Sequence, residues 1–326
     1  MFDWSKQAIL LTGGTGSFGQ AFTKYILKHH PPKSLRIYSR DEFKQYEMQQ
    51  KFHHKNLRFF IGDVRDAERL NRAMEGVTLV IHAAAMKQIV ASEYNPTEAI
   101  KTNIIGTMNV LNAGIDAGVE RIFGLITDKA VSPINLYGAT KLVMEKLLVQ
   151  GNAYVGKKKT KIACIRYGNV AGSRGSVIPL FIKQNKTNQF TLTHPEMTRF
   201  WLTLNNGIEF VVKFIESMRG GEVYVPKLPS FRVIDLATAV NRDAKLKYIG
   251  IRQGEKIHED LITVHEARHV REFPSHFVVY PQFDFWHDSS LKFPGKSVHN
   301  NFNYNSKSNI NYLSVKTLTE LLEKLD

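Results

Sequence analysis

Among the features of this sequence, a glycine-rich turn near the amino terminus most strongly limits the folds that the chain can adopt. The apolar run Ala8–Thr12 predicts a buried strand, and Gly13-Gly14-Thr15-Gly16-Ser17-Phe18-Gly19 follows it directly. Small residues let backbone amides approach a pyrophosphate, and a helix from about Ser17 presents its positive end there. A turn also needs glycine, but a strand before it and a helix after it are the context of nucleotide binding. The sequence therefore predicts dinucleotide contacts from Gly13, Thr15, Gly16, Ser17, Phe18 and Gly19.

Apolar runs continue to alternate with helix-like segments through the first half of the 326-residue chain. Further strands are predicted at 35–39, 57–62, 78–85, 121–127 and 161–167, and a helix from Pro96 to about Ala117. This order predicts an α/β protein with a doubly wound, Rossmann-type parallel sheet and a smaller mixed α/β substrate domain. We expect residues 1–170 to form the cofactor domain, with 200–228 packing back on it. Residues 171–199 and 229–326 form the substrate domain.

The ends of the second, third and fourth predicted strands indicate which dinucleotide is bound. An acidic residue after the second strand serves the ribose of NAD, whereas an arginine accommodates the 2′-phosphate of NADP. Ser39, Arg40 and Lys44 favour NADP, while Asp41 keeps NAD open or caps the next helix. Further cofactor contacts are expected from Asp63, Val64, Ala83 and Ala84. Lys87 then faces either a substrate or water.

Four titratable residues gather between Thr127 and Lys141. Tyr137 and Lys141 are four residues apart at the start of a predicted helix, so they share one face. A phenol has a pKa near 10 and needs a nearby positive charge to act as a base at neutral pH. Asp128 and Lys129 add a second acid–base pair at the end of the preceding strand. A Tyr-x-x-x-Lys pair is common on amphipathic helices, so the upstream nucleotide turn is what makes this one informative. Asn103, among apolar neighbours, is expected to bond to the active-site backbone.

Composition narrows the class of protein further. The hydrophobic fraction of 43% can fill a core, and the single cysteine, Cys164, excludes an intramolecular disulfide. No secretion signal or long apolar run appears, so we expect a cytoplasmic protein without membrane association. The formal charge of +14 suits anionic ligands. Because the basic residues are dispersed, nucleic acid is not expected as a partner.

One motif points to a different chemistry. His265-Glu266-Ala267-Arg268-His269 has the H-E-x-x-H form of a zinc protease helix. Arg268 and Arg271 crowd it with positive charge, and Pro274 soon ends any helix. We therefore interpret it as a chance match and expect no metal site.

Together, these motifs resemble the extended short-chain dehydrogenase/reductase superfamily. Within it they are most similar to the inverting UDP-N-acetylglucosamine 4,6-dehydratases of pseudaminic-acid-type sugar synthesis. The resemblance spans about residues 5 to 262 and includes the segments 12–19, 39–44, 62–66, 82–87, 93–96, 127–141, 166–176, 197–201, 221–227 and 250–256. Its diagnostic feature is Thr-Asp-Lys at 127–129, where retaining dehydratases have Thr-Asp-Glu. Residues beyond about 265 match no motif.

The resemblance implies a role for each residue of the predicted site. Tyr137 would take the C4 hydroxyl proton while hydride passes to NADP, and Lys141 would lower the pKa of Tyr137 and hold the nicotinamide ribose. Lys129 would remove the C5 proton. A lysine base must be partly neutral, which requires either desolvation or crowding by positive charge, for which Lys141 and Lys87 are the candidate neighbours. Asp128 would protonate the departing C6 hydroxyl. The UDP-N-acetylglucosamine would be held by Lys87, Asn169, Arg199, Arg252 and Glu255. The resemblance also implies a homo-oligomer, a dimer or a hexamer.

Three alternatives remain open at this point. Lys129 could form only an ordinary salt bridge with Asp128. The chain could be a retaining dehydratase or a 4-epimerase on the same scaffold, although neither requires Lys129. It could also be a non-catalytic NADP-binding regulator, which would not need Asp128 and Lys129.

Overall fold

The computed structural model describes residues 2–172, 176–283, 285 and 293–324. Residues 173–175, part of the segment 166–176 that contributes to the resemblance, lie outside the described residues. Within the described chain, no helix is both long and apolar enough to cross a lipid bilayer.

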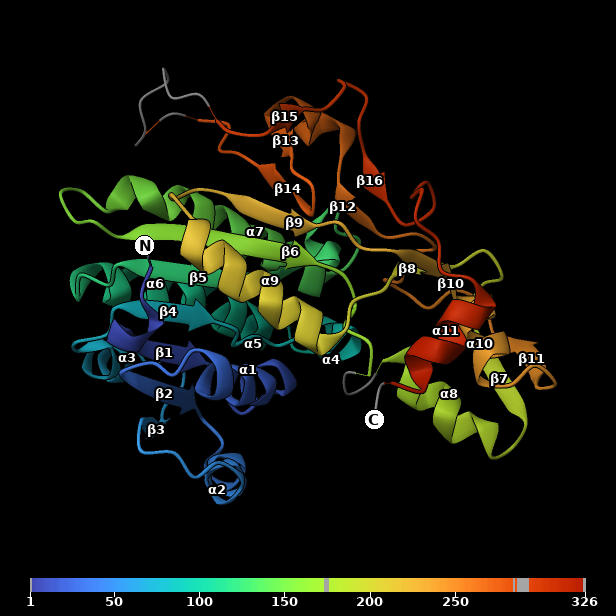
Figure 1. The fold of residues 1–326 in the computed structure, drawn as a ribbon, viewed down its shortest axis with the longest axis horizontal. Coiled ribbons are helices and arrows are strands. Elements are labelled where there is room, and N and C mark those ends of the chain that lie inside the picture. Colours follow the sequence, from blue (N-terminus) through green and yellow to red (C-terminus); the bar gives the residue numbers. More distant parts are fainter. Residues whose placement is uncertain (1, 173–175, 284, 286–292, 325–326) are drawn as a thin grey trace.

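A parallel sheet forms the centre of the molecule (Figure 1). Its strands run in the order β3-β2-β1-β4-β5-β6-β9, and each adjacent pair is parallel. β1 is buried along its whole length, as expected for a strand covered on both faces. The strands are β1 (Ala8–Thr12), β2 (Ser34–Ser39), β3 (Leu57–Ile61), β4 (Leu79–His82), β5 (Arg121–Thr127), β6 (Lys161–Tyr167) and β9 (Val223–Pro226). The prediction of a doubly wound parallel sheet is confirmed.

Helices cover both faces of this sheet. α1 packs against α9 on one face, and α3, α6 and α7 pack together on the other (Figure 1). Two apolar cores result, one under each layer. The helices are α1 (Ser17–His29), α2 (Glu42–Lys51), α3 (Ala67–Met74), α4 (Ile89–Tyr94), α5 (Pro96–Ile100), α6 (Gly106–Asp116), α7 (Leu136–Gln150) and α9 (Leu204–Ser217), with short turns η1 (Trp4–Lys6), η3 (Asp128–Ala130) and η4 (Gly151–Tyr154).

The helical run that begins at Pro96 is less regular than the single helix expected. α5 and α6 are joined by a π-helical turn, η2 (Lys101–Ile105). Such turns occur often at functional sites, because they re-aim side chains within a helix. Thr102 and Asn103 are buried in this turn.

An antiparallel extension continues the sheet beyond β9. β14 (His276–Val279) pairs with β9, β13 (Val270–Glu272) pairs with β14, and β15 (Lys296–Ser297) pairs with β13. These strands lie within 229–326, which the sequence analysis assigned to the substrate domain, yet they hydrogen-bond into the central sheet. The assignment of 270–297 to the substrate domain therefore needs correction. The pairing of β14 with β9, which joins the hairpin β13–β14 to the central sheet, links segments far apart in the chain and leaves no local trace in the sequence.

A smaller mixed region lies beyond the carboxyl ends of the parallel strands, at the right of Figure 1. Its core contains Phe181, Phe190, Trp201, Leu236 and Leu318. β8 pairs with β10, β7 with β11, and β12 with β16. Its elements are α8 (Val177–Asn185), β7 (Gln189–Leu192), β8 (Thr198–Phe200), β10 (Ser230–Arg232), α10 (Val233–Val240), β11 (Lys245–Tyr248) and α11 (Val315–Leu322). By contrast, β12 (Asp260–Ile262) and β16 (Tyr304–Asn305) lie above β9 in Figure 1, with η5 (Val264–His269) following β12, and their apolar side chains pack into a core of the central sheet.

Candidate active site

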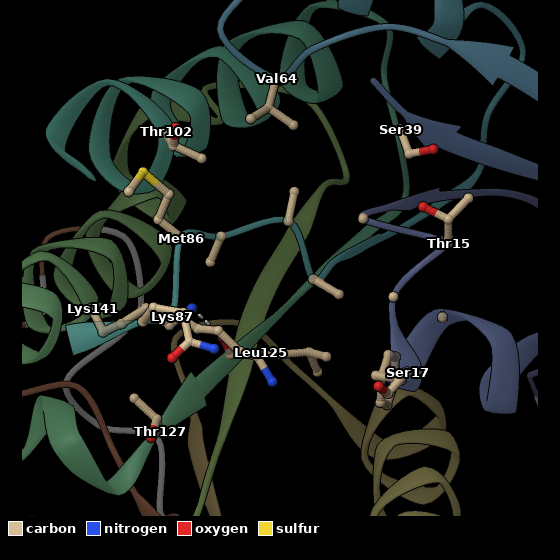
Figure 2. Close-up of a pocket in the computed structure, with 18 of the residues that line it drawn as sticks. Thr15, Ser17, Ser39, Val64, Met86, Lys87, Thr102, Leu125, Thr127 and Lys141 are labelled. Carbon is tan, nitrogen blue, oxygen red and sulfur yellow. Dashed lines mark hydrogen bonds between the residues drawn. The ribbon is translucent and has the colours of Figure 1, made fainter. Parts of the chain in front are cut away.

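A cavity of about 710 Å³ runs along the carboxyl ends of the parallel strands. Figure 2 shows side chains from several strands and helices converging on it. Its lining includes these predicted residues: Gly13, Thr15, Gly16, Ser17, Phe18, Gly19, Ser39, Arg40, Lys44, Asp63, Val64, Ala83, Ala84, Lys87, Lys129, Tyr137, Lys141 and Asn169. Asp128, Arg199, Arg252 and Glu255 are not among the described lining residues. The roles assigned to all these residues remain predictions.

The glycine turn forms one end of the cavity and leaves no room for side chains. Gly13 has a φ of 66°, and a Cβ there would come within 2.9 Å of the Ala84 backbone. A Cβ on Gly19 would overlap the carbonyl of Gly14. Gly16 precedes α1 without a side-chain cap, so the first amides of that helix have no side-chain acceptor. Uncapped amides beside a tight backbone cradle fit a dinucleotide pyrophosphate.

The end of β2 carries the residues expected to select the ribose substituent. Asp41 accepts a hydrogen bond from the Lys44 amide at 3.0 Å and pairs with Lys44 Nζ at 2.6 Å. It therefore caps α2, the second of the two roles predicted for it. Arg40 is exposed, and its guanidinium lies 3.8 Å from the Asp63 carboxylate. Arg65 also binds that carboxylate, at 2.7 Å. An exposed guanidinium at the cavity edge fits an anionic ribose substituent.

Tyr137 and Lys141 lie one turn apart on α7 and are both buried. The Asn135 side chain caps this helix by accepting the Gly138 amide at 2.7 Å. Lys141 Nζ donates to the Leu125 carbonyl at 2.7 Å, and burial lowers the pKa of Lys141 to about 8. Burial raises the pKa of Tyr137 to about 12, against the opposing charge of Lys129. Lys129 is thus the neighbouring cation that partly counteracts this rise in the Tyr137 pKa. The sequence analysis assigned that effect to Lys141.

The ammonium group of Lys129 is surrounded by oxygen atoms. Its Nζ lies 3.1 Å from Asp128 Oδ1, 2.8 Å from Asn169 Oδ1 and 3.7 Å from Glu259 Oε1. Burial alone would lower the Lys129 pKa, but the Asp128 and Glu259 charges outweigh burial and raise it. The expectation that Lys141 and Lys87 would crowd Lys129 with positive charge is wrong. Two carboxylates surround it, and the cation that opposes them is Arg199.

Asp128 is fully buried at the start of η3. Its Oδ1 accepts hydrogen bonds from the Thr127 hydroxyl at 2.7 Å and the Lys129 amide at 2.9 Å. Its Oδ2 has no hydrogen-bond partner among the described residues. A buried carboxylate oxygen without a partner costs free energy, so its persistence beside Lys129, which lines the cavity, suits a proton-transfer role.

Arg199 does not project into the cavity. Its guanidinium donates to the carbonyls of Thr198, Lys256 and Ile257 at 2.7–3.0 Å, and it lies 3.4 Å from Glu255. Arg252 is exposed on the loop before Glu255. Direct contact of Arg199 with a substrate would require this arrangement to open.

The expected hydrogen bonding of Asn103 to the active-site backbone is confirmed. Its side chain accepts from the Met86 amide at 2.8 Å and donates to the Met86 carbonyl at 3.0 Å. It also donates to Thr140 Oγ1 at 2.9 Å, and Thr140 in turn donates to the Tyr137 carbonyl at 2.8 Å. The π-turn thus ties the loop after β4 to the start of α7.

The H-E-x-x-H segment has a structural role. It forms the short 3₁₀ helix η5, in which Glu266 completes a capping box with Thr263. The Glu266 carboxylate also lies 2.9 Å from buried Arg166, which pairs with Glu145 at 2.6 Å. These contacts occupy the carboxylate that a zinc protease would need as its base.

Glu259 is the site residue that sequence reasoning missed. Glu259 is 2% exposed and directly precedes β12. It lies 130 residues from Lys129 in the chain. Its only local signal is a carboxylate beside the apolar pair Leu261-Ile262. That signal is too common to indicate an active site.

Comparisons with known proteins agree with this geometry. A family model described as polysaccharide biosynthesis protein matches residues 9–281. The chain is 45% identical to a UDP-N-acetylglucosamine 4,6-dehydratase (inverting) of Campylobacter jejuni, over 98% of each chain. It is 42% identical to a UDP-glucose 4-epimerase of Rickettsia rickettsii, over 80% of this chain and 79% of that one. Among solved structures, Pen from Bacillus thuringiensis superposes with a TM-score of 0.90 and 35% identity, covering 99% of this chain and 98% of that one.

The fold and its glycine-lined cavity define an extended short-chain dehydrogenase/reductase. More narrowly, the chain belongs to the polysaccharide biosynthesis protein family. The Campylobacter alignment also extends beyond residue 265, so the interpretation of that tail as unmatched is wrong.

Proposed function

We propose that this protein is an inverting UDP-N-acetylglucosamine 4,6-dehydratase. The observation that carries the proposal is a group of three residues at one end of the dinucleotide-type cavity. Tyr137 and Lys129 line the cavity, and buried Asp128 lies behind them, with its Oδ1 3.1 Å from Lys129 Nζ. The near full-length similarity to the Campylobacter enzyme supports the same reaction. The product is a 4-keto-6-deoxy sugar nucleotide of L-arabino configuration.

The nicotinamide cofactor, when bound, supplies hydride acceptance from C4 and hydride return to C6. Tyr137, once ionised to the phenolate, accepts the C4 hydroxyl proton, and Lys141 holds the nicotinamide ribose. The resulting 4-ketone acidifies the C5 proton, which Lys129 removes. Asp128, in its protonated form, gives a proton to the C6 hydroxyl as it leaves as water. Hydride return to C6 is balanced by a solvent-derived proton that adds to C5 on the opposite face. Lys129 must first lose its own proton, and closure of the site over a substrate favours that by further desolvation.

NADP is the proposed cofactor in preference to NAD. Arg40 is exposed at the end of β2, while Asp41 is engaged with Lys44. The Asp41 carboxylate is therefore not free to accept a hydrogen bond from the ribose 2′-hydroxyl of NAD. Arginine suits a phosphate because its planar fork binds two oxygens.

The substrate is proposed to lie beyond the nicotinamide end of the cavity. Lys87 and Asn169 are exposed there and line it. Arg252 and Glu255 would reach the nucleotide from their loop, with Arg199 supporting that loop through its carbonyl contacts. Assembly into a homo-oligomer and a cytoplasmic location belong to the same proposal.

A 4-epimerase is the second candidate, since a relative at 42% identity carries that name. An epimerase oxidises and reduces at C4 alone, so it has no need for a base at C5 or an acid at C6. Exchange of the C5 hydrogen with solvent therefore distinguishes the dehydratase from the epimerase.

The test is incubation of the protein with UDP-N-acetylglucosamine and NADP in D₂O, followed by NMR of the product. We expect deuterium at C5, no solvent deuterium at C6 and inverted configuration at C5. Retained C5 configuration would exclude the inverting assignment. A C4 epimer without loss of water would favour the epimerase instead.

A further inference from the structure

Glu259 is a buried carboxylate that the proposed steps leave without a role. It is 2% exposed, and its Oε1 lies 3.7 Å from both Lys129 Nζ and Arg199 Nε. Its Oε2 has no hydrogen-bond partner among the described residues. Burial of a carboxylate with an unsatisfied oxygen is costly, so a fold that keeps one beside a proposed base invites an explanation.

We propose that Glu259 is a positioning residue, which holds the Lys129 ammonium against Asp128 and Asn169 and keeps it protonated until substrate binds. This inference rests on the proposed function for its kinetic consequence, although not for its geometry. The Lys129 ammonium has three oxygen neighbours, and they come from η3, from the loop after β6 and from the segment before β12. Glu259 is the neighbour that anchors it from the segment before β12.

The carboxyl-terminal part of the chain fixes Glu259 in place. The Glu259 amide donates to Ser306 Oγ at 2.8 Å, and the Ser306 amide donates to the Glu259 carbonyl at 2.8 Å. Ser306 is itself fully buried and bonds to Thr198 Oγ1 at 2.7 Å. Ser306 thus holds the Glu259 backbone through its hydroxyl and its amide, and we call this pair of hydrogen bonds the Ser306 clamp.

A role limited to neutralising Arg199 explains these contacts less well. The Arg199 guanidinium already donates to three carbonyls and lies 3.4 Å from Glu255. Charges near Lys129 come from Asp128, Glu259, Arg199 and Tyr137, and those near Glu259 also include Lys256. Burial and then the Asp128 charge raise the Glu259 pKa, so the two carboxylates disfavour each other's ionisation around one ammonium. Removal of the Glu259 charge would therefore ease deprotonation of Lys129.

The experiment compares wild type with Glu259→Gln and Glu259→Asp. Exchange of the C5 hydrogen of UDP-N-acetylglucosamine in D₂O is measured against pH. In wild type the rate should rise with pH and level off only where Lys129 loses its proton. In Glu259→Gln the levelling of the rate should move down by about 1–3 pH units, since an opposite charge at this distance has that effect. The plateau should also fall, because Lys129 loses an anchor.

Glu259→Asp retracts the charge by one methylene group and should give a smaller shift in the same direction. It tests the proposal by itself if Glu259→Gln does not fold. Glu222→Gln is the matched control: Glu222 is 3% exposed, and its carboxylate accepts hydrogen bonds from the Arg219 and Gly220 amides, at 2.8 and 2.7 Å. This control should lose stability without moving the pH dependence. Superposition of the Glu259-variant and wild-type pH profiles would overturn the proposal.

Absence of C5 exchange in wild type would reject the proposed function and leave the Glu259 proposal testable. The Lys129 Nζ resonance can be followed by ¹⁵N NMR, with Lys129→Ala for its assignment. Lys129 should lose its proton at a lower pH in Glu259→Gln than in wild type. Identical titrations would show that Glu259 has only a structural role.

Discussion

The two ends of the cavity are built in opposite ways. At the cofactor end, Gly13, Gly16 and Gly19 lie within seven residues and act through their backbone. At the acid–base end, Lys129 meets Asn169 and Glu259, which come from segments up to 130 residues away. The first end is set by local geometry, whereas the second exists only when the segment around β12 has packed beside η3.

The energetics of the two ends differ in the same sense. The glycine turn needs only space and unpaired amides. The acid–base end buries Asp128, Glu259 and Arg199 around a half-buried Lys129. Buried charges are tolerable only while they are paired, so the loss of one partner leaves the others uncompensated. Substitutions at the acid–base end should therefore alter individual chemical steps, and substitutions at the cofactor end should alter binding.

The largest effect is expected at the acid–base end from Tyr137→Phe. The variant keeps the ring but loses the group that accepts the C4 proton, so oxidation should slow by about 10²–10⁴-fold. Binding of UDP-N-acetylglucosamine should persist. Reduction of the bound nicotinamide, followed by absorbance, measures this first step.

Tyr224→Phe serves as the matched control for Tyr137→Phe. Tyr224 is 4% exposed in β9 and packs against Phe214 away from the cavity. Its loss of a hydroxyl should leave oxidation unchanged. Near-normal oxidation in Tyr137→Phe would place the C4 base elsewhere.

Lys129→Ala should divide the reaction into its two halves. Oxidation at C4 should continue at a reduced rate, because the cation that lowers the Tyr137 pKa is lost. Removal of the C5 proton should slow much more, by about 10²–10⁴-fold. The 4-ketone and the reduced nicotinamide should then accumulate on the enzyme. Rapid quenching with NMR of the sugar detects the ketone, and normal C5 exchange in this variant would remove Lys129 from the mechanism.

Prediction from sequence succeeded where the determinants are local. The parallel sheet followed from apolar runs, and the position of Asp41 at the start of a helix followed from its residue type. Asn103 was predicted because a lone amide among apolar residues needs partners. The environment of Lys129 was predicted wrongly, because Glu259 reaches it only through the pairing of β12 with β16 and the Ser306 clamp. The β13–β15 extension was missed for the same reason.

Gly19→Ala tests the cofactor end and should weaken NADP and NAD together. Its Cβ would overlap the Gly14 carbonyl, so the turn and the first amides of α1 must shift. Overpacking of this kind costs about 1–3 kcal/mol, on the order of a hundredfold in affinity at most. Fluorescence titration with each reduced cofactor measures it. A loss confined to one cofactor would contradict a role in binding the pyrophosphate, which both share.

Arg40→Ala should give the smallest and most selective effect. The Arg40 guanidinium is exposed and only 3.8 Å from Asp63, which Arg65 also binds, so its removal should leave the fold intact. Loss of a charge-assisted contact to a 2′-phosphate costs about 1.5–3 kcal/mol, roughly ten- to a hundredfold in affinity. NADP binding should weaken by that factor and NAD binding should stay nearly constant, because NAD carries no phosphate at this position. Lys6→Ala, which removes an exposed cation on η1, is the control for net charge. Equal weakening of NADP and NAD in Arg40→Ala would show that Arg40 does not read the 2′-phosphate, and the cofactor end would then owe its affinity to the glycine turn alone.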